Sequence, residues 1–94
     1  MLPVVVRPWV EVDIFDAVLN DRGLLGQILF DLNNHLPSNL AQYQSKRVTA
    51  HSACFWYDRT YSLDPTSFKL RRLRFVVRDS DPAVLEVIWV IVVA

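Results

Sequence analysis

The sequence has few of the residues that mark specialised chemistry. Cys54 is the single cysteine in 94 residues, so no disulfide forms within the chain, which suits a reducing cytoplasmic environment. The chain has two glycines, and neither belongs to a loop of the kind that cradles phosphate. Ten basic residues balance ten acidic ones, which argues against an indiscriminate polyanion binder.

Long hydrophobic runs are also absent. The longest apolar stretch, Ala83–Ala94, has one charged residue, Glu86, and is shorter than the ~20 residues that a membrane span needs. The N-terminal residues lack the basic start and the long apolar core of a signal peptide. With 52% hydrophobic and 12% aromatic residues, the chain is expected to fold as one domain over residues 1–94, away from membranes.

The first half of the chain predicts a strand and a helical hairpin. Val4–Val12 is rich in valine and predicts a strand that is bent or placed at an edge by Pro8. A short helix is expected over Asp13–Asn20, with Asp13 as its N-cap. A second helix, capped by Asp21, is expected to end near His35, and residues 37–45 are expected to form a loop. Its apolar stripe, which should face the sheet, consists of Leu24, Leu25, Ile28, Leu29, Leu32 and Leu36.

The second half predicts three strands, at Ala53–Tyr61, Phe68–Asp79 and Ala83–Ala94. The last is apolar on both faces and is expected to be an inner strand, covered on each side. In the middle strand the apolar parity changes at Arg71 and Arg72, which predicts a β-bulge there. The fold class is therefore α+β: an N-terminal strand, a two-helix hairpin and a three-stranded antiparallel meander in one sheet.

Arginines in the middle strand are the first candidate for a functional site. Arg72, Arg74 and Arg78 should point away from the apolar side chains, and guanidinium groups bind phosphates well. Aromatic side chains close in sequence could stack bases. The alternative is a solvated sheet face whose arginines pair with acidic residues, and the residues alone favour it. The further candidates for phosphate or base contacts are Lys46, Arg47, Arg59, Trp56, Tyr57 and Tyr61, and the acidic partners would be Asp58, Asp79 and Glu86.

Metal and nucleophile sites find little support. His51 and Cys54 resemble half of a zinc site, but a second such pair is missing, so neither a metal nor a cofactor is expected. Cys54 lies in an apolar strand, where it is expected to be a small core residue. The tryptophans, at positions 9, 56 and 89, are expected to be core or interface anchors.

The order of strand, two helices and three strands resembles the RelE/ParE superfamily of bacterial toxins from toxin–antitoxin pairs. The run from Leu73 to Val90, a basic strand that turns through acidic residues into an apolar strand, is similar to that family's penultimate hairpin. The run from Leu36 to Arg47, which leads from the leucine-rich helix into a tyrosine and then basic residues, also resembles it.

The resemblance implies an mRNA interferase that acts at the ribosome and is held by an antitoxin. It assigns Arg74 and Arg78 to the basic strand positions that orient and neutralise the scissile phosphate, and Lys46 and Arg47 to the basic segment after the helices. The chain departs from the family in its zero net charge and in having no histidine or tyrosine after Trp89. These departures predict that positioning persists while acid–base catalysis is weakened.

Two other functions stay open. The apolar last strand suits a non-catalytic interaction module, either a homodimer or one subunit of a heteromeric complex. The arginines and aromatic residues also suit a small RNA-binding protein that does not cleave.

Overall fold

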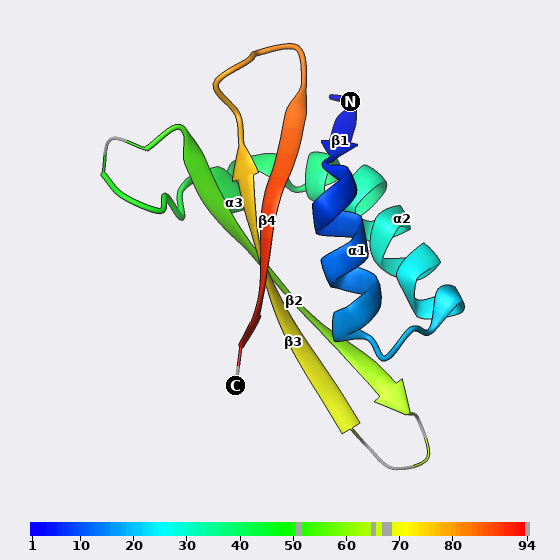
Figure 1. Ribbon diagram of the computed structural model, residues 1–94. Helices are drawn as coiled ribbons and strands as arrows, with labels where there is room; N and C mark the ends of the chain where they lie inside the picture. Colours follow the sequence, from blue (N-terminus) through cyan, green and yellow to red (C-terminus); the bar gives the residue numbers. More distant parts are fainter. Residues whose placement is uncertain (51, 65, 67–68, 94) are drawn as a thin grey trace.

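A computed structural model describes residues 1–50, 52–64, 66 and 69–93. It has an α+β fold in which a helix pair covers one side of a curled, mixed sheet (Figure 1). Predictions that fall on His51, Pro65, Phe68 and Ala94 lie outside the described residues. The elements, in chain order, are β1 (Val4–Val6), α1 (Pro8–Ala17), α2 (Arg22–Ser38), α3 (Leu40–Gln44), β2 (Cys54–Asp64), β3 (Lys69–Arg78) and β4 (Leu85–Val93).

The first strand is shorter than predicted, and the first helix begins earlier. Pro8 takes the first helical position of α1, where the missing N–H costs nothing and the fixed φ angle suits a helix. The prediction of a strand over Val4–Val12 is therefore wrong beyond Val6. Asp13 lies inside the helix, so its predicted role as N-cap is wrong too.

The second helix begins as predicted and ends later. Its N-cap is Asp21, whose carboxylate accepts a hydrogen bond from the backbone N–H of Leu24 at 3.0 Å. The helix continues past His35 to Ser38, and α3 follows where a loop was expected. Four residues of the predicted stripe of α2 are buried in the core: Leu24, Ile28, Leu32 and Leu36. Leu25 and Leu29, which were predicted to share it, are only partly buried.

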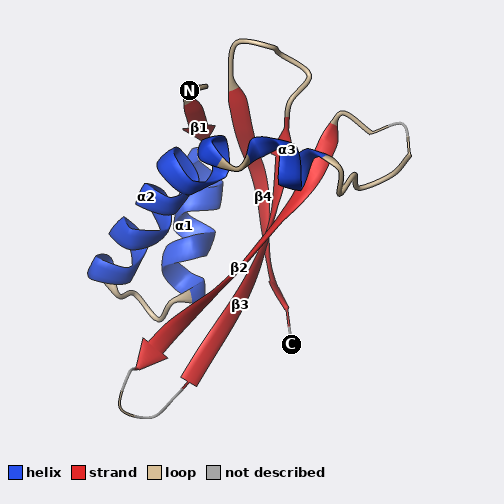
Figure 2. Cartoon of the chain, turned by 180° about the vertical axis from the view of Figure 1, so that it is seen from behind, coloured by secondary structure: helices blue, strands red, loops and turns tan. Residues whose placement is uncertain are grey.

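The strand order is β1-β4-β3-β2. The pairs β2–β3 and β3–β4 are antiparallel, whereas β1 pairs with β4 in parallel, so the sheet is mixed and not wholly antiparallel. β4 is an inner strand, as predicted, where Leu85–Val87 lie opposite Val4–Val6. Figure 2 shows β2 and β3 as a long twisted ribbon that extends well past the helices.

The predicted bulge at Arg71 and Arg72 is wrong, because β2 and β3 pair without interruption there. Arg71 lies opposite Tyr61, and Arg72 lies opposite Thr60. The side chain of Arg71 therefore points to the same side of the sheet as Leu73, near the start of β3, where the strand is no longer covered. Successive side chains alternate regularly between the two faces along this part of the strand.

A register shift instead separates β3 and β4 in the middle of the sheet. Val77 lies opposite Val87, but the preceding residue, Val76, lies opposite Trp89. Ile88 is thus an extra residue in β4, which is the arrangement of a β-bulge. The bulge reverses which face the following side chains point to, so Trp89 leaves the face on which Val87 is buried.

The core lies entirely between the sheet and the helices. Every buried residue of the described chain is apolar or aromatic, and α3 joins this layer because the ring of Tyr43 packs edge-on against Tyr57 at 4.7 Å. The buried strand residues alternate along each strand: Phe55, Tyr57 and Tyr61 in β2, Leu73, Phe75 and Val77 in β3, and Leu85 and Val87 in β4. None of the three tryptophans belongs to this core, contrary to one of the two roles expected for them.

Candidate functional site

Within the part of the chain that the structure describes, the other face of the sheet carries no helix. The helices α1, α2 and α3 pack on the buried face (Figures 1 and 2). The alternate side chains of β2, β3 and β4 therefore point to the opposite side. We call this surface the open face. Its residues are Cys54, Trp56, Asp58 and Thr60 of β2, Arg72, Arg74, Val76 and Arg78 of β3, and Glu86, Trp89, Ile91 and Val93 of β4.

A row of two tryptophans crosses the middle of the open face. Val76 lies opposite Trp89 on one side and opposite Trp56 on the other. The two tryptophans therefore stand two strand spacings apart, about 10 Å. Trp89 is 56% exposed, and the guanidinium of Arg74 lies 5.0 Å from the ring centre of Trp56. Such rings offer flat apolar faces to a planar ligand.

Two arginines share one carboxylate on one side of this row. Asp58 accepts hydrogen bonds from Arg74 at 2.9 and 3.0 Å and one from Arg72 at 3.4 Å. The hydrogen bonds from Arg74 hold the pKa of Asp58 below its usual value, so this carboxylate is ionised at neutral pH. The group formed by Asp58, Arg72 and Arg74 therefore carries a net charge of +1.

The same arrangement recurs on the other side of the row. Glu86 accepts a hydrogen bond from Arg78 at 3.0 Å and pairs as well with Arg7, which precedes α1. The pKa of Glu86 lies below its usual value because Arg78 donates to it and Arg7 is near. Arg7 also lies over the ring of Trp9, at 5.7 Å, so a third tryptophan borders the open face.

The charges of the open face therefore do not cancel. Each carboxylate neutralises one of the two arginines that it contacts, which leaves an excess of about two positive charges beside an aromatic row. This agrees in part with the alternative that the arginines pair with acidic residues, since Asp58 and Glu86 are partners. Asp79, the third acidic residue named for that role, pairs with Arg47 instead.

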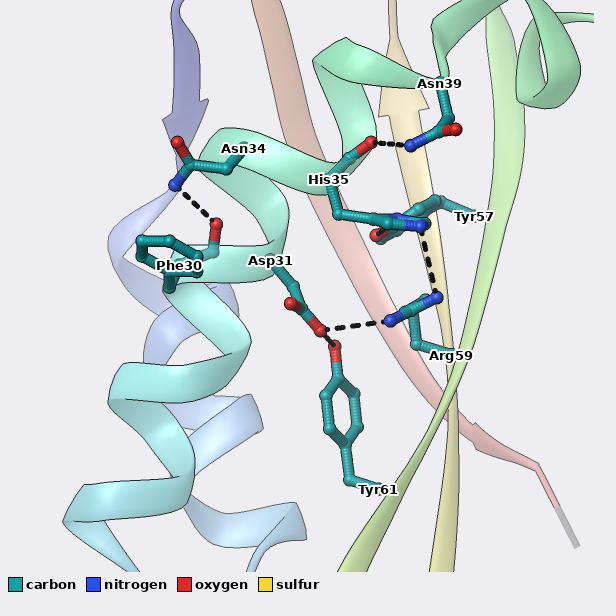
Figure 3. A network of polar contacts seen from close by, with 8 residues as sticks. All are labelled: Phe30, Asp31, Asn34, His35, Asn39, Tyr57, Arg59 and Tyr61. Carbon is teal, nitrogen blue, oxygen red and sulfur yellow. Dashed lines mark hydrogen bonds and ion pairs between the residues drawn. The ribbon is translucent and has the colours of Figure 1, made fainter.

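Tyr57 and Tyr61, predicted to stack bases, lie on the buried face. Their exposed fractions are 0% and 4%, so neither ring is accessible and that prediction is wrong. Both belong to a polar network between α2 and β2, drawn in Figure 3, together with Asp31, His35 and Arg59.

The network joins helix to strand through its hydroxyl groups. Tyr61 donates to Asp31 at 2.9 Å, and the hydroxyl of Tyr57 lies 2.7 Å from Nδ1 of His35. Arg59 reaches Nε2 of His35 at 3.4 Å and Asp31 at 3.5 Å. A guanidinium only donates, so Nε2 accepts and the ring proton is assigned to Nδ1, which donates to Tyr57. Burial is the main cause of the raised pKa of both tyrosines, which are therefore neutral hydroxyl donors or acceptors.

The two basic residues after the helices are held apart from the open face. Arg47 donates to both oxygens of Asp79, at 2.7 and 2.8 Å, and lies over the ring of Phe55. Lys46 is exposed, and its ammonium group lies 5.5 Å from the ring centre of Tyr43. Of the nine candidate residues for phosphate or base contacts, the structure thus brings four together on the open face: Trp56, Arg72, Arg74 and Arg78.

Sequence reasoning missed Arg7 and the place of Trp89. Arg7 was expected inside a strand, and no sequence pattern signals that it meets Glu86, 79 positions away. Simple alternation from Leu85 puts Trp89 on the buried face, and only the extra residue Ile88 reverses it. Cys54, expected in the core, is half-buried at the start of β2, opposite Arg78.

The rest of the described chain offers little else. No group of three His, Cys, Asp or Glu side chains within residues 1–50, 52–64, 66 and 69–93 is placed to hold a metal ion. No described helix is both long and apolar enough to cross a membrane. A shallow groove of about 280 Å³ lies between α1 and α2; its lining is apolar except for Glu11, and consists of Pro8, Glu11, Val12, Phe15 and Leu25.

Comparisons with known proteins identify no relative. No protein-family profile matches the chain, and neither a curated protein nor a solved structure matches it.

Proposed function

We propose that this chain binds single-stranded RNA on its open face. The observation that carries the proposal is the row of Trp89, Val76 and Trp56 between two arginine–carboxylate–arginine groups. Proteins that bind single strands combine aromatic faces, on which bases stack, with cationic groups that follow the phosphates.

The geometry supports a contact of two or more nucleotides. One base stacks on Trp89 and another on Trp56, with Val76 as the apolar floor between them. Each group of two arginines and one carboxylate has one positive charge left to pair with a phosphate. The cations of these two groups are all arginines: Arg7, Arg72, Arg74 and Arg78. Arginine suits this role better than lysine, because a guanidinium can contact a carboxylate and a phosphate oxygen with different N–H groups.

Cleavage has weaker support than binding. In-line attack by a 2′-hydroxyl needs a group that removes a proton and a group that stabilises charge. Arg74 and Arg78 can supply the second function, but the two carboxylates of the open face are engaged by arginines. His35 lies in the network on the opposite side of the sheet. We therefore assign Arg74 and Arg78 to binding and positioning of phosphate.

Binding is tested with a fluorescently labelled, unstructured RNA of about ten nucleotides, titrated at several salt concentrations. We expect salt-sensitive binding, and at least about a tenfold loss of affinity when Arg74→Ala and Arg78→Ala are combined. Arg22→Ala, at an exposed position of α2, is the matched control and should bind like the wild type. Absence of binding at low salt, or an equal loss in the control, would contradict the proposal.

We propose that the protein acts in the cell as a toxin with a RelE/ParE-like fold, and that the open face is its functional surface. The order of one strand, two main helices and three strands, with the helices on one side, supports it. Expression in bacteria should slow growth, and the Arg74→Ala plus Arg78→Ala variant should relieve the effect. Normal growth beside intact RNA binding in vitro would remove the toxin role and keep the RNA-binding one.

A further inference from the structure

We propose that two copies of this chain pair through the free edge of β4 and form a continuous eight-stranded sheet. The contact uses residues 89–93, which we call the edge segment. β1 covers β4 only at Leu85–Val87, so among the described residues no strand lies beside the edge segment on that side. In both Figure 1 and Figure 2 this end of β4 diverges from α1 and is open at its outer edge.

The edge segment is exposed on both of its faces. Ile91 belongs to the open face and is 39% exposed, while Val92 points to the helix side and is 44% exposed. Trp89 is 56% exposed. The helices thus cover the first half of β4, whereas in the second half only Val90 packs partly against the core. An apolar strand with unpaired backbone groups and two wet faces is a ready template for another strand.

A second copy fits this edge because the segment is self-complementary. In an antiparallel pair centred on Ile91, that residue faces its own copy, Trp89 faces Val93, and Val90 faces Val92. Every cross-strand pair is then apolar, and none places like charges opposite each other. The nearest charge in the strand, Glu86, is already engaged by Arg7 and Arg78. The zero net charge of the chain also removes long-range repulsion between copies.

The two-fold symmetry of such a contact closes the assembly. Both free edge segments are consumed, so association stops at the dimer and does not extend into a fibre. With the axis perpendicular to the sheet, the open faces of the two copies lie on the same side and become continuous. The pairing does not depend on RNA binding, and it is measured without RNA.

Sizing by light scattering and sedimentation, from about 1 to 100 µM, tests the pairing. We expect a reversible monomer–dimer equilibrium in the wild type. Ile91→Lys places two positive charges opposite each other at the symmetry axis and should raise the dissociation constant at least about tenfold. Leu70→Lys is the matched control: Leu70 is 67% exposed on β3, outside the edge segment, and the dimer should survive its change.

A mixture of charge variants tests the register itself. Ile91→Lys and Ile91→Glu should each be monomeric, and mixing them should restore a heterodimer because opposite charges then face each other. In the Cys54→Ser background, a nitroxide on Ile91→Cys should show strong spin–spin broadening in the dimer, which reports the pairing even if the lysine variant is unstable. A monomeric wild type at the highest concentration, species larger than a dimer, a heteromeric partner found to be required, or an unbroadened spectrum would overturn the proposal.

Discussion

Asp58 and Glu86 each contact two arginines on the open face, and this sharing sets how those arginines behave. One carboxylate supplies one negative charge, so each group keeps a net positive charge and its guanidinium groups keep N–H donors for another anion. The carboxylates thus hold the arginines in place and at the same time compete with a phosphate for them.

This competition predicts that removing a carboxylate strengthens RNA binding. Asp58→Asn frees Arg72 and Arg74 from their shared partner, so affinity for single-stranded RNA should rise roughly three- to tenfold at moderate salt. The slope of log K against log salt should steepen by about 0.7 if one more phosphate is engaged. Fluorescence anisotropy at four salt concentrations measures both quantities.

Asp31→Asn is the control for this experiment, because Asp31 lies in the network on the helix side of the sheet. It changes the net charge of the protein equally and should leave the salt slope unchanged. Weaker binding by Asp58→Asn would show that the carboxylate is needed to hold the arginines in position.

Asp79 predicts how stability changes with pH. Hydrogen bonds from Arg47 hold its pKa below the usual value, so the folded state binds this proton less readily than the unfolded state. Its contribution to stability is therefore full above the unfolded pKa, about 4, and is lost as pH falls through the lower folded pKa. The gap in urea midpoint between wild type and Asp79→Asn should be wide at pH 6 and narrow near pH 2.

Asp13→Asn, at an exposed position of α1, controls for the loss of one negative charge. If the difference in urea midpoint between wild type and Asp79→Asn stayed constant with pH, the ion pair with Arg47 would contribute nothing to the stability of the fold.

At the scale of elements, the apolar stripe of α2 supplies four of the buried residues of the core. Leu32 is fully buried, so Leu32→Ala should lower the free energy of unfolding by roughly 2–5 kcal/mol. Phe30 is 66% exposed two positions earlier, and Phe30→Ala should change it by less than about 0.5 kcal/mol. Urea unfolding followed by circular dichroism compares the two; equal effects would mean that the stripe does not face the core.

The elements also show how far the sequence alone could predict this structure. The second helix, its Asp21 cap and the arginine face of β3 follow from local periodicity and capping, and they were predicted. The end of β1 was not, because Pro8 is compatible with both a strand edge and a first helical turn, and packing on the sheet decides between them.

The row of Trp56, Val76 and Trp89 could not be predicted from the sequence, for a related reason. It depends on the extra residue Ile88, and a bulge inside a uniformly apolar strand leaves no trace in the hydrophobic pattern. Likewise, the valine-rich sequence predicted cover on both faces of the last strand, and that prediction is wrong, because the described helices all lie on one side of the sheet. On the helix side the cover is complete at Leu85 and Val87, whereas Val92 is 44% exposed.

For the whole molecule, the tryptophans make one surface visible by fluorescence. Trp56 and Trp89 belong to the open face, and Trp9 borders it through its hydrogen bond to the carbonyl of Ile88 at 3.4 Å. We expect acrylamide to quench the emission of the native protein efficiently, and saturating single-stranded RNA to protect it and to lower its intensity by stacking. A Trp89→Leu plus Trp56→Leu variant should lose most of the response to RNA. An unchanged response would place the RNA away from the open face.

The helix-free side of the sheet also has a consequence for how this protein can change over time. Residues that hold the fold together point one way from each strand, and residues available for recognition point the other, so the two sets are subject to almost separate constraints. Replacements at positions such as Trp56, Val76 or Ile91 remove little interior packing, and a library randomised there should retain folded members at high frequency. The same scaffold can therefore acquire new ligands by drift on one side while its interior stays as it is.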